Sequence, residues 1–218
     1  MLWNARDSDT LRTRALIYGA FSDLLASPFD DAAAVNYRVL AGRLATAAAF
    51  LPFPFNADEV AAAAGPELAD PALVRRHYSS LFEVGGDGPP VPLRADLVRN
   101  NETISKEEVI RFYDHFGFNL APQYQWAPDH LSIMLEFIKV LTLRETSAAD
   151  GEQVVTMAVG ARDFTARHLA TWLPLATARL AKIENRGGFF GCVLKATAAF
   201  ITLDLAWQAE TAGQLEGY

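Results

Sequence analysis

Apolar residues recur along this chain every three or four positions, as on one face of an α-helix, and no segment shows the two-residue alternation of a strand. The first such segment runs from Leu11 to Leu25 and ends at Ser27-Pro28. The pattern predicts further helices over residues 34–50, 70–82, 105–116, 152–170, 172–183 and 189–209, and one more that begins at Pro128. We therefore expect an all-α, single-domain helical bundle of about eight or more helices over residues 1–218, with residues 117–128 as a candidate hinge.

Two predicted helices have clear boundary signals. Asp70 can cap a helix that opens with proline. The segment Ser105-Lys-Glu-Glu108 is a capping box, and Ile104 and Val109 around it have the spacing of a hydrophobic staple. Gly117 suits the end of that second helix, because glycine adopts the left-handed conformation of a helix C-terminus at no steric cost.

The triplet Pro128-Asp129-His130 opens a long apolar helix directly after an aromatic-rich loop. Pro128 fits the first helical position. In the first turn, the helix dipole would stabilise the negative charge of Asp129. Asp129 would then share one polar stripe of the helix with Ser132 and Glu136. Two interpretations remain open for Asp129 and His130. Either they only stabilise the helix start, or they form a polar functional site at its mouth.

Aromatic residues gather in the sequence before this helix. They either line a peptide-binding groove, as apolar anchors beside carboxylates that select basic residues, or close the core between two helical layers. The same two interpretations apply to Tyr78 and Phe82. The aromatic set comprises Tyr113, Phe116, Phe118, Tyr124 and Trp126.

Composition and charge narrow the possible partners and locations. A formal net charge of −7 argues against nucleic acid, which requires a basic face, and suits a basic peptide. The first residues form no secretory signal, so we expect a cytoplasmic protein. The apolar stretch 189–207 contains Lys195 and Asp204, which is typical of a buried helix, so we expect no stable membrane insertion.

The sequence shows no pattern of an enzyme site. None of the 4 histidines has another His, Cys, Asp or Glu three or four positions away, which excludes a helical metal pair. The neighbours Asp129-His130 and Asp114-His115 would diverge on a helix and make poor catalytic dyads. The glycine-rich segment 85–90 lacks the Lys and Ser/Thr of a phosphate loop. We therefore predict no catalytic residues, no metal and no cofactor.

Several short motifs follow one another in a fixed order, and their order and spacing are more specific than any one of them. By these motifs the chain resembles the TorD/DmsD/NarJ family of cytoplasmic chaperones, which mature molybdenum enzymes of the dimethyl sulfoxide reductase type. Within that family it is most similar to the branch that serves dimethylsulfide or ethylbenzene dehydrogenase and selenate or chlorate reductase. The motifs are Tyr78-Ser-Ser-Leu-Phe82, Gly85-Gly-Asp-Gly-Pro-Pro90, Tyr113-Asp-His-Phe-Gly-Phe118, Pro128-Asp-His-Leu131, Leu135-Glu-Phe137 and His168-Leu-Ala-Thr-Trp-Leu-Pro174.

The resemblance implies a system-specific chaperone that is not an enzyme. It implies binding of the apo catalytic subunit of a molybdopterin enzyme, with its twin-arginine signal peptide where one exists, by a monomer or a domain-swapped dimer. A helical interaction or regulatory module unrelated to molybdoenzymes, and a cofactor-independent enzyme, are the alternatives. The residues implied in partner binding are Tyr78, Phe82, Pro89, Pro90, Tyr124, Trp126, Pro128, Asp129, His130 and Glu136.

Overall fold

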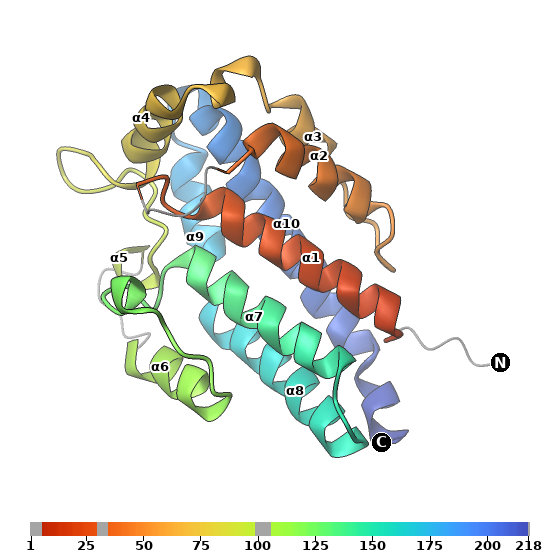
Figure 1. Ribbon diagram of the computed structural model, residues 1–218. Helices are drawn as coiled ribbons and strands as arrows, with labels where there is room; N and C mark the ends of the chain where they lie inside the picture. The colour runs from red at the N-terminus through yellow and green to blue at the C-terminus, as the bar shows by residue number, and fades with distance from the viewer. Residues whose placement is uncertain (1–5, 30–34, 99–105, 218) are drawn as a thin grey trace.

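The computed structural model describes residues 6–29, 35–98 and 106–217, and within these ranges it contains ten α-helices, four short 3-10 helices and no strand (Figure 1). The all-α prediction is confirmed. In chain order the elements are α1 (Ser8–Leu25), α2 (Tyr37–Ala48), α3 (Asp58–Ala62), η1 (Pro66–Ala69), α4 (Pro71–Phe82), α5 (Ala95–Val98), α6 (Lys106–His115), η2 (Pro122–Tyr124), α7 (Leu131–Thr146), α8 (Gly151–His168), α9 (Leu173–Leu180), η3 (Glu184–Gly187), α10 (Gly188–Glu210) and η4 (Ala212–Gly217).

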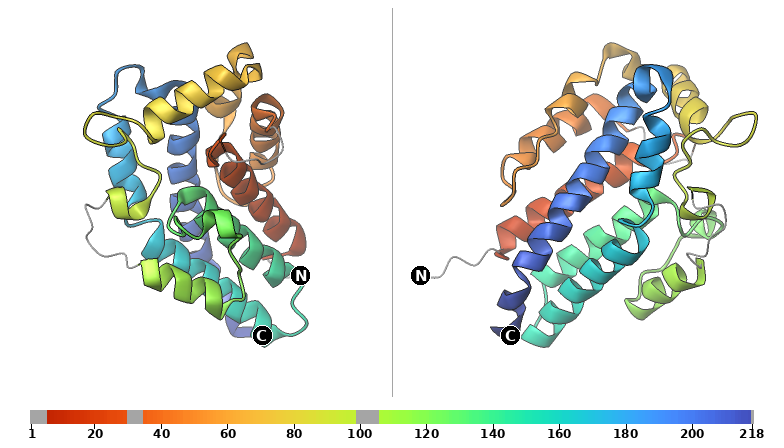
Figure 2. Two further views of the ribbon diagram at one scale, coloured as in Figure 1. Left: turned by 60° about the vertical axis from the view of Figure 1, so that its left-hand side comes forward. Right: turned by 180° about the vertical axis from the view of Figure 1, so that it is seen from behind.

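Four long helices make up the body of the molecule. Helix α1 packs along α7, α7 packs along α8, and α10 contacts both α1 and α8 (Figures 1 and 2). Helices α2 and α3 cover α1 and α10, and α9 packs against α10. Helix α4 lies at one end of the bundle, near the end of α1, and the hydroxyl of Tyr78 on α4 donates to the Leu25 carbonyl at 2.9 Å. The long connection after α4 therefore runs over this same end, toward the start of α7 (Figure 1).

Local side-chain caps explain where several helices begin. The Asp70 carboxylate accepts the backbone N–H groups of Ala72 and Leu73, as its position before proline predicted. The side chains of Asn36 and Asp150 cap α2 and α8 in the same way. At the other end of α6, Gly117 has a positive φ of 60°, which supports its predicted role as a helix terminator.

The predicted start of α7 is wrong by three residues. Pro128 and Asp129 form a turn, His130 is the N-cap residue with extended backbone, and the helix begins at Leu131. The reason is tertiary, because backbone hydrogen bonds to the chain around Leu93 hold this segment extended. Asp129 is therefore not a first-turn acid and does not belong to a polar stripe of the helix.

Other predicted helices differ from the observed ones by a few residues at their ends, which is the usual uncertainty of such boundaries. Helix α2 begins at Tyr37 and ends at Ala48, inside the predicted 34–50. Helix α9 covers Leu173–Leu180, inside the predicted 172–183. The capping box at Ser105 and its staple partner Ile104 lie outside the described residues, and α6 is described from Lys106 onward.

A buried ionic network joins α1 to α10. The Arg14 guanidinium donates to both Asp204 oxygens at 2.5 and 2.9 Å, and the hydroxyl of Tyr18 donates to the same carboxylate at 2.7 Å. Helix α10 is the one helix of the described residues that is long and apolar enough to cross a membrane by length and composition, and half of its apolar window is buried within the protein. Asp204, which interrupts its apolar run, is thus paired inside the bundle.

Candidate functional site

Two connections meet at the end of the bundle where α4 ends and α7 begins. The N–H of Leu131 donates to the Leu93 carbonyl at 2.8 Å, and the N–H of Ala95 donates to the Asp129 carbonyl at 3.3 Å. Together they form an isolated antiparallel bridge that joins the loop after α4 to the turn before α7. This bridge brings the glycine- and proline-rich motif and the Pro-Asp-His motif together, although about 40 residues separate them in the sequence.

Asp129 holds the two connections together through its side chain. Its carboxylate accepts the backbone N–H of Asp96 at 3.0 Å and lies 3.7 Å from Nε of Arg94. The Asp129 side chain is only 1% exposed, and burial raises the pKa of its carboxyl group despite these partners. Because its own chain surrounds it, Asp129 is not available for direct contact with a basic residue of a partner, contrary to the expectation from the sequence.

Arg94 links this ion pair to the most exposed aromatic side chain of the site. Its guanidinium donates to the Asp96 carboxylate at 2.5 Å, and its central carbon lies 5.4 Å from the centre of the Trp126 ring. Trp126 is 67% exposed. A cation over an indole face attracts the ring electrostatically, so Arg94 holds Trp126 in place at the surface.

A pocket of about 350 Å³ lies between these connections. Its walls come from the end of α1, the last turn of α4, the loop around α5, the turn after η2 and the start of α7. Leu97 and Ile133 add apolar surface, and Glu83 adds a carboxylate that accepts the Ser27 hydroxyl at 3.2 Å. Six of the predicted site residues line the pocket, namely Tyr78, Phe82, Pro89, Tyr124, Trp126 and His130.

Tyr78 and Phe82 satisfy both interpretations that the sequence left open. Both side chains are buried and their rings meet edge to face at 5.0 Å, so they belong to the core. Both also border the pocket, which makes them its floor. Tyr124 and Trp126 also line the pocket, on and just after η2.

His130 faces the pocket as a neutral side chain. Its Nδ1 accepts the backbone N–H of Ser132 at 3.3 Å and lies 2.8 Å from the Ser132 hydroxyl, so the ring proton is on Nε2. Burial, with a further contribution from Arg94, lowers the pKa of His130 to about 4. At neutral pH the imidazole therefore offers a hydrogen-bond donor at Nε2 and no charge.

The other predicted residues do not line the pocket. The Pro128 carbonyl accepts the Tyr113 hydroxyl at 2.9 Å, which fixes the turn before α7. Pro90 is exposed on the loop after α4, and Glu136 pairs with Lys139 at 2.8 Å further along α7. Asp129 supports the pocket from behind, through Arg94 and Asp96.

Three of the aromatic residues that the sequence analysis considered for a groove belong to the core instead. Tyr113 and Phe116 are buried, and Phe118 is partly buried. Tyr113 and Phe118 contact the Phe137 ring at 4.8 and 5.3 Å. The second interpretation, closure of the core between helical layers, is therefore correct for these three residues.

Sequence analysis missed several residues of the pocket, above all Arg94. No helical spacing or charge cluster marks this arginine, which lies in a short irregular segment. Its one sequence signal is its place directly after the proline-rich loop, within Val91-Pro-Leu-Arg-Ala95. Over residues 6–29, 35–98 and 106–217, no group of three His, Cys, Asp or Glu side chains could hold a metal ion.

Comparison with known proteins identifies the class of this chain. The model of the nitrate reductase delta subunit family matches residues 43–178, which include all ten predicted site residues. The chain belongs to this family, and the resemblance to the TorD/DmsD/NarJ chaperones is confirmed.

Its curated relatives are chaperones for particular reductases. The chain is 35% identical over 159 residues to the selenate reductase assembly chaperone protein of Thauera selenatis, covering 68% of this chain and 81% of the relative. It is 37% identical over 134 residues to the chlorate reductase assembly chaperone protein of Ideonella dechloratans, covering 58% and 69%. These relatives support a system-specific maturation chaperone, and an unrelated interaction module is not favoured.

A solved structure described as a redox enzyme maturation protein from Archaeoglobus fulgidus is also similar. It is 20% identical, covers 69% of this chain and 90% of that chain, and has a TM-score of 0.41. That score is too low to support an inference about this chain.

Proposed function

We propose that this chaperone binds the apo catalytic subunit of a molybdenum-containing reductase until its cofactor is inserted, and that the pocket beside Trp126 is a main contact. The proposal draws on the selenate and chlorate reductase chaperones, whose names state their clients. The observation that carries it is Trp126, an indole 67% exposed that Arg94 holds over a pocket with an aromatic floor. Large, pre-positioned aromatic side chains beside a pocket are typical of protein interfaces.

The chemistry of the pocket suits an extended peptide with apolar and polar side chains. Tyr78, Phe82 and Ile133 can receive an apolar side chain, and the Nε2 proton of His130 can donate to a peptide carbonyl. Glu83 provides an exposed carboxylate for a basic residue, such as an arginine of a twin-arginine signal peptide. In this scheme the exposed Glu83, and not the buried Asp129, supplies the carboxylate that pairs with a basic residue of the partner.

Binding rather than catalysis is the proposed activity. His130 and Ser132 form a histidine–serine contact at the pocket, but a histidine with a pKa of about 4 is too weak a base to activate a serine hydroxyl at neutral pH. The neighbouring charge is the Arg94 cation instead of an orienting carboxylate. We further propose that the protein works in the cytoplasm, before its client is exported, and needs no cofactor. A single domain hinged at residues 117–128 remains a prediction.

Affinity purification tests the proposed partner. A tagged chain is expressed in its own host, with molybdenum cofactor synthesis either intact or blocked, and co-purifying proteins are identified by mass spectrometry. We expect one large molybdoenzyme catalytic subunit, enriched when the cofactor is missing because the apo form accumulates. Many unrelated partners, or none, would contradict the proposal.

A matched pair of variants tests the pocket. Trp126→Ala should weaken capture of the catalytic subunit about tenfold or more, because an exposed aromatic anchor is lost, while the melting temperature stays unchanged. Phe50 is 70% exposed and does not line the pocket, so Phe50→Ala is the control and should leave capture unchanged. Equal capture by the two variants would show that the client binds elsewhere.

A further inference from the structure

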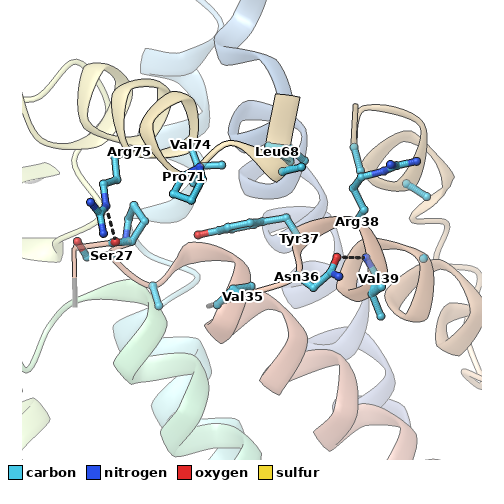
Figure 3. A pocket seen from close by; sticks show the side chains of 16 residues that line it. Ser27, Val35, Asn36, Tyr37, Arg38, Val39, Leu68, Pro71, Val74 and Arg75 are labelled. Carbon is cyan, nitrogen blue, oxygen red and sulfur yellow. Dashed lines mark hydrogen bonds between the residues drawn. The ribbon is translucent and has the colours of Figure 1, made fainter. Parts of the chain in front are cut away.

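A second and larger pocket lies further along α4, toward the start of that helix, and Ser27 lines both pockets. The larger pocket has a volume of about 1010 Å³ and is bordered by the end of α1, the start of α2, the α3–η1 region and the first turns of α4 (Figure 3). The first turns of α4 line this pocket, whereas its last turn lines the pocket beside Trp126. None of the ten predicted site residues borders the larger pocket.

Tyr37 points its hydroxyl group into this space. The residue is 6% exposed, and its ring meets Phe189 and Phe190 edge to face at 6.0 and 5.8 Å. In Figure 3 the hydroxyl lies in the opening between α4 and Val35, and it has no hydrogen-bond partner among the described residues. A buried phenol that faces a cavity without a partner is a ready hydrogen-bond donor for a bound group.

Among the described residues that line the pocket, the charged ones are Arg38 and Arg75. Glu67 and Asp70 are sequence neighbours of lining residues but do not line the pocket, and the Asp70 carboxylate is occupied as the cap of α4. Arg75 donates from Nε to the Pro28 carbonyl at 3.3 Å, and this bond leaves its two terminal nitrogens available (Figure 3). Arg38 is exposed and forms no ion pair within the part of the chain that the structure describes. The rest of the lining is mostly apolar, with Leu68 and Val74 as examples.

The rim extends the apolar surface beyond the pocket itself. Val39 is 47% exposed at the start of α2, and Phe29 is 54% exposed with its ring centre 5.7 Å from the Arg75 guanidinium. Val39 lines the pocket and Phe29 does not, so a small molecule inside the pocket would leave Phe29 in water. A peptide that crosses the rim would cover Phe29 as well, and apolar rim contacts beside arginines are typical of protein recognition.

We propose that this pocket binds a short acidic and apolar segment of a protein partner. One carboxylate of the segment is paired with Arg75 and accepts the Tyr37 hydroxyl, and a second is paired with Arg38 at the other end of the pocket (Figure 3). A leucine- or phenylalanine-like side chain packs on Leu68 and Val74. The site is a second docking point, separate from the pocket beside Trp126, and it does not rest on the function proposed for that pocket.

Peptide titration tests this assignment. The probe is acetyl-Leu-Glu-Phe-Asp-Leu-amide, and its counterpart with both acids replaced by lysine is the charge control. We expect the acidic peptide to bind the wild-type chain and to lose about tenfold in affinity with Arg38→Gln/Arg75→Gln, because two charged contacts are removed. Tyr37→Phe, which removes one hydrogen bond and retains the ring, should lose about three- to fivefold.

Three controls separate the site from general electrostatics and from the other pocket. Arg12→Gln/Arg111→Gln also removes two positive charges, but from exposed positions outside the pocket. It should change the affinity for the peptide by less than about twofold. Trp126→Ala should leave acidic-peptide binding unchanged. Circular dichroism and thermal melting of each variant confirm that it is folded.

Several results would overturn the proposal. They are failure of the acidic peptide to bind at millimolar concentration, equal binding of the lysine peptide, or an equal loss in the Arg12/Arg111 control. A loss with Trp126→Ala would move the peptide to the other pocket. If hexanoate competes as strongly as the peptide, the site is assigned to a small amphiphile instead. If the chain dimerises in a concentration-dependent way and Arg38→Gln/Arg75→Gln abolishes this dimerisation, the site is assigned to a second copy of the chain.

Discussion

The Asp129 carboxylate accepts a hydrogen bond from the backbone N–H of Asp96 at 3.0 Å, and so caps the short helix α5 instead of its own helix. This bond, with the Arg94 ion pair, attaches the loop after α4 to the turn before α7. The rigid back wall of the candidate pocket therefore depends on a residue that no partner can reach directly.

Asp129→Ala should destabilise the protein by about 2–3 kcal/mol, because it removes a charge-assisted hydrogen bond and one partner of the partly buried ion pair with Arg94. Asp129→Asn, which retains a hydrogen-bond acceptor, should lower the unfolding free energy by less than Asp129→Ala does. Asp114 is exposed in the other Asp-His pair of the sequence, and Asp114→Ala is the control, expected within about 0.5 kcal/mol of wild type. Urea unfolding measures all three, and equal stability of Asp129→Ala and Asp114→Ala would contradict the structural role.

His130 should make stability depend on pH. Its pKa is about 4 in the folded protein, below the ordinary value of 6.5, so its stabilising contribution is complete above about pH 6.5 and is lost as the pH falls toward 4. Between pH 5 and 6.5 the unfolded state binds up to one more proton at His130 than the folded state does. His130→Asn should therefore reduce the slope of the unfolding free energy against pH by up to about 1.4 kcal/mol per pH unit. Burial also lowers the pKa of His168, so part of the slope should remain. An unchanged slope in the variant would show that His130 is not buried as a neutral side chain.

Gly160 allows α8 to approach the Phe116 ring closely. A Cβ atom built on Gly160 would clash with Cζ of Phe116, so Gly160→Ala should destabilise the protein by about 1–3 kcal/mol despite the higher helix propensity of alanine. Gly42 in α2 has no atom within 4 Å of such a Cβ, and Gly42→Ala should stabilise by about 0.5–1 kcal/mol. Thermal melting should therefore move in opposite directions for the two substitutions, and parallel shifts would refute the close packing.

The Arg14–Asp204 pair should show strong energetic coupling. Arg14→Met leaves the Asp204 carboxylate buried without its cation and should cost about 3–5 kcal/mol. The double variant with Asp204→Leu should be much less destabilised than the sum of the two single variants, with a coupling energy of about 2 kcal/mol or more. Arg12 and Asp9 form an exposed pair at 3.8 Å on the same helix, and a cycle on that pair should give less than about 0.5 kcal/mol. Additive single effects at Arg14 and Asp204 would disprove the coupling.

The sequence by itself determined the helices, because their signals are local. Asp70 caps the residues that directly follow it, and Gly117 ends a helix through its own backbone freedom, so neither needs a distant partner. The ordered motifs also identified the family, because a motif is defined by residue types and their spacing along the chain and not by their positions in space. Part of the site followed as well, because Trp126 and His130 lie beside the predicted helix mouth and do border the pocket.

Only the tertiary structure decided how these parts combine. Because of the backbone bridge to residues 93–95, α7 begins three residues later than predicted and the Asp129 side chain is buried. A local sequence pattern cannot predict a hydrogen bond to a segment more than 30 residues away. The same bridge places Arg94 beside His130 at the pocket, which the sequence did not predict. Tyr37 reads in the sequence as an ordinary helical aromatic, and only the packing of α2, α4 and α10 around it leaves its hydroxyl facing a cavity. Helix formation depends on neighbours in the chain, whereas a pocket depends on neighbours in space.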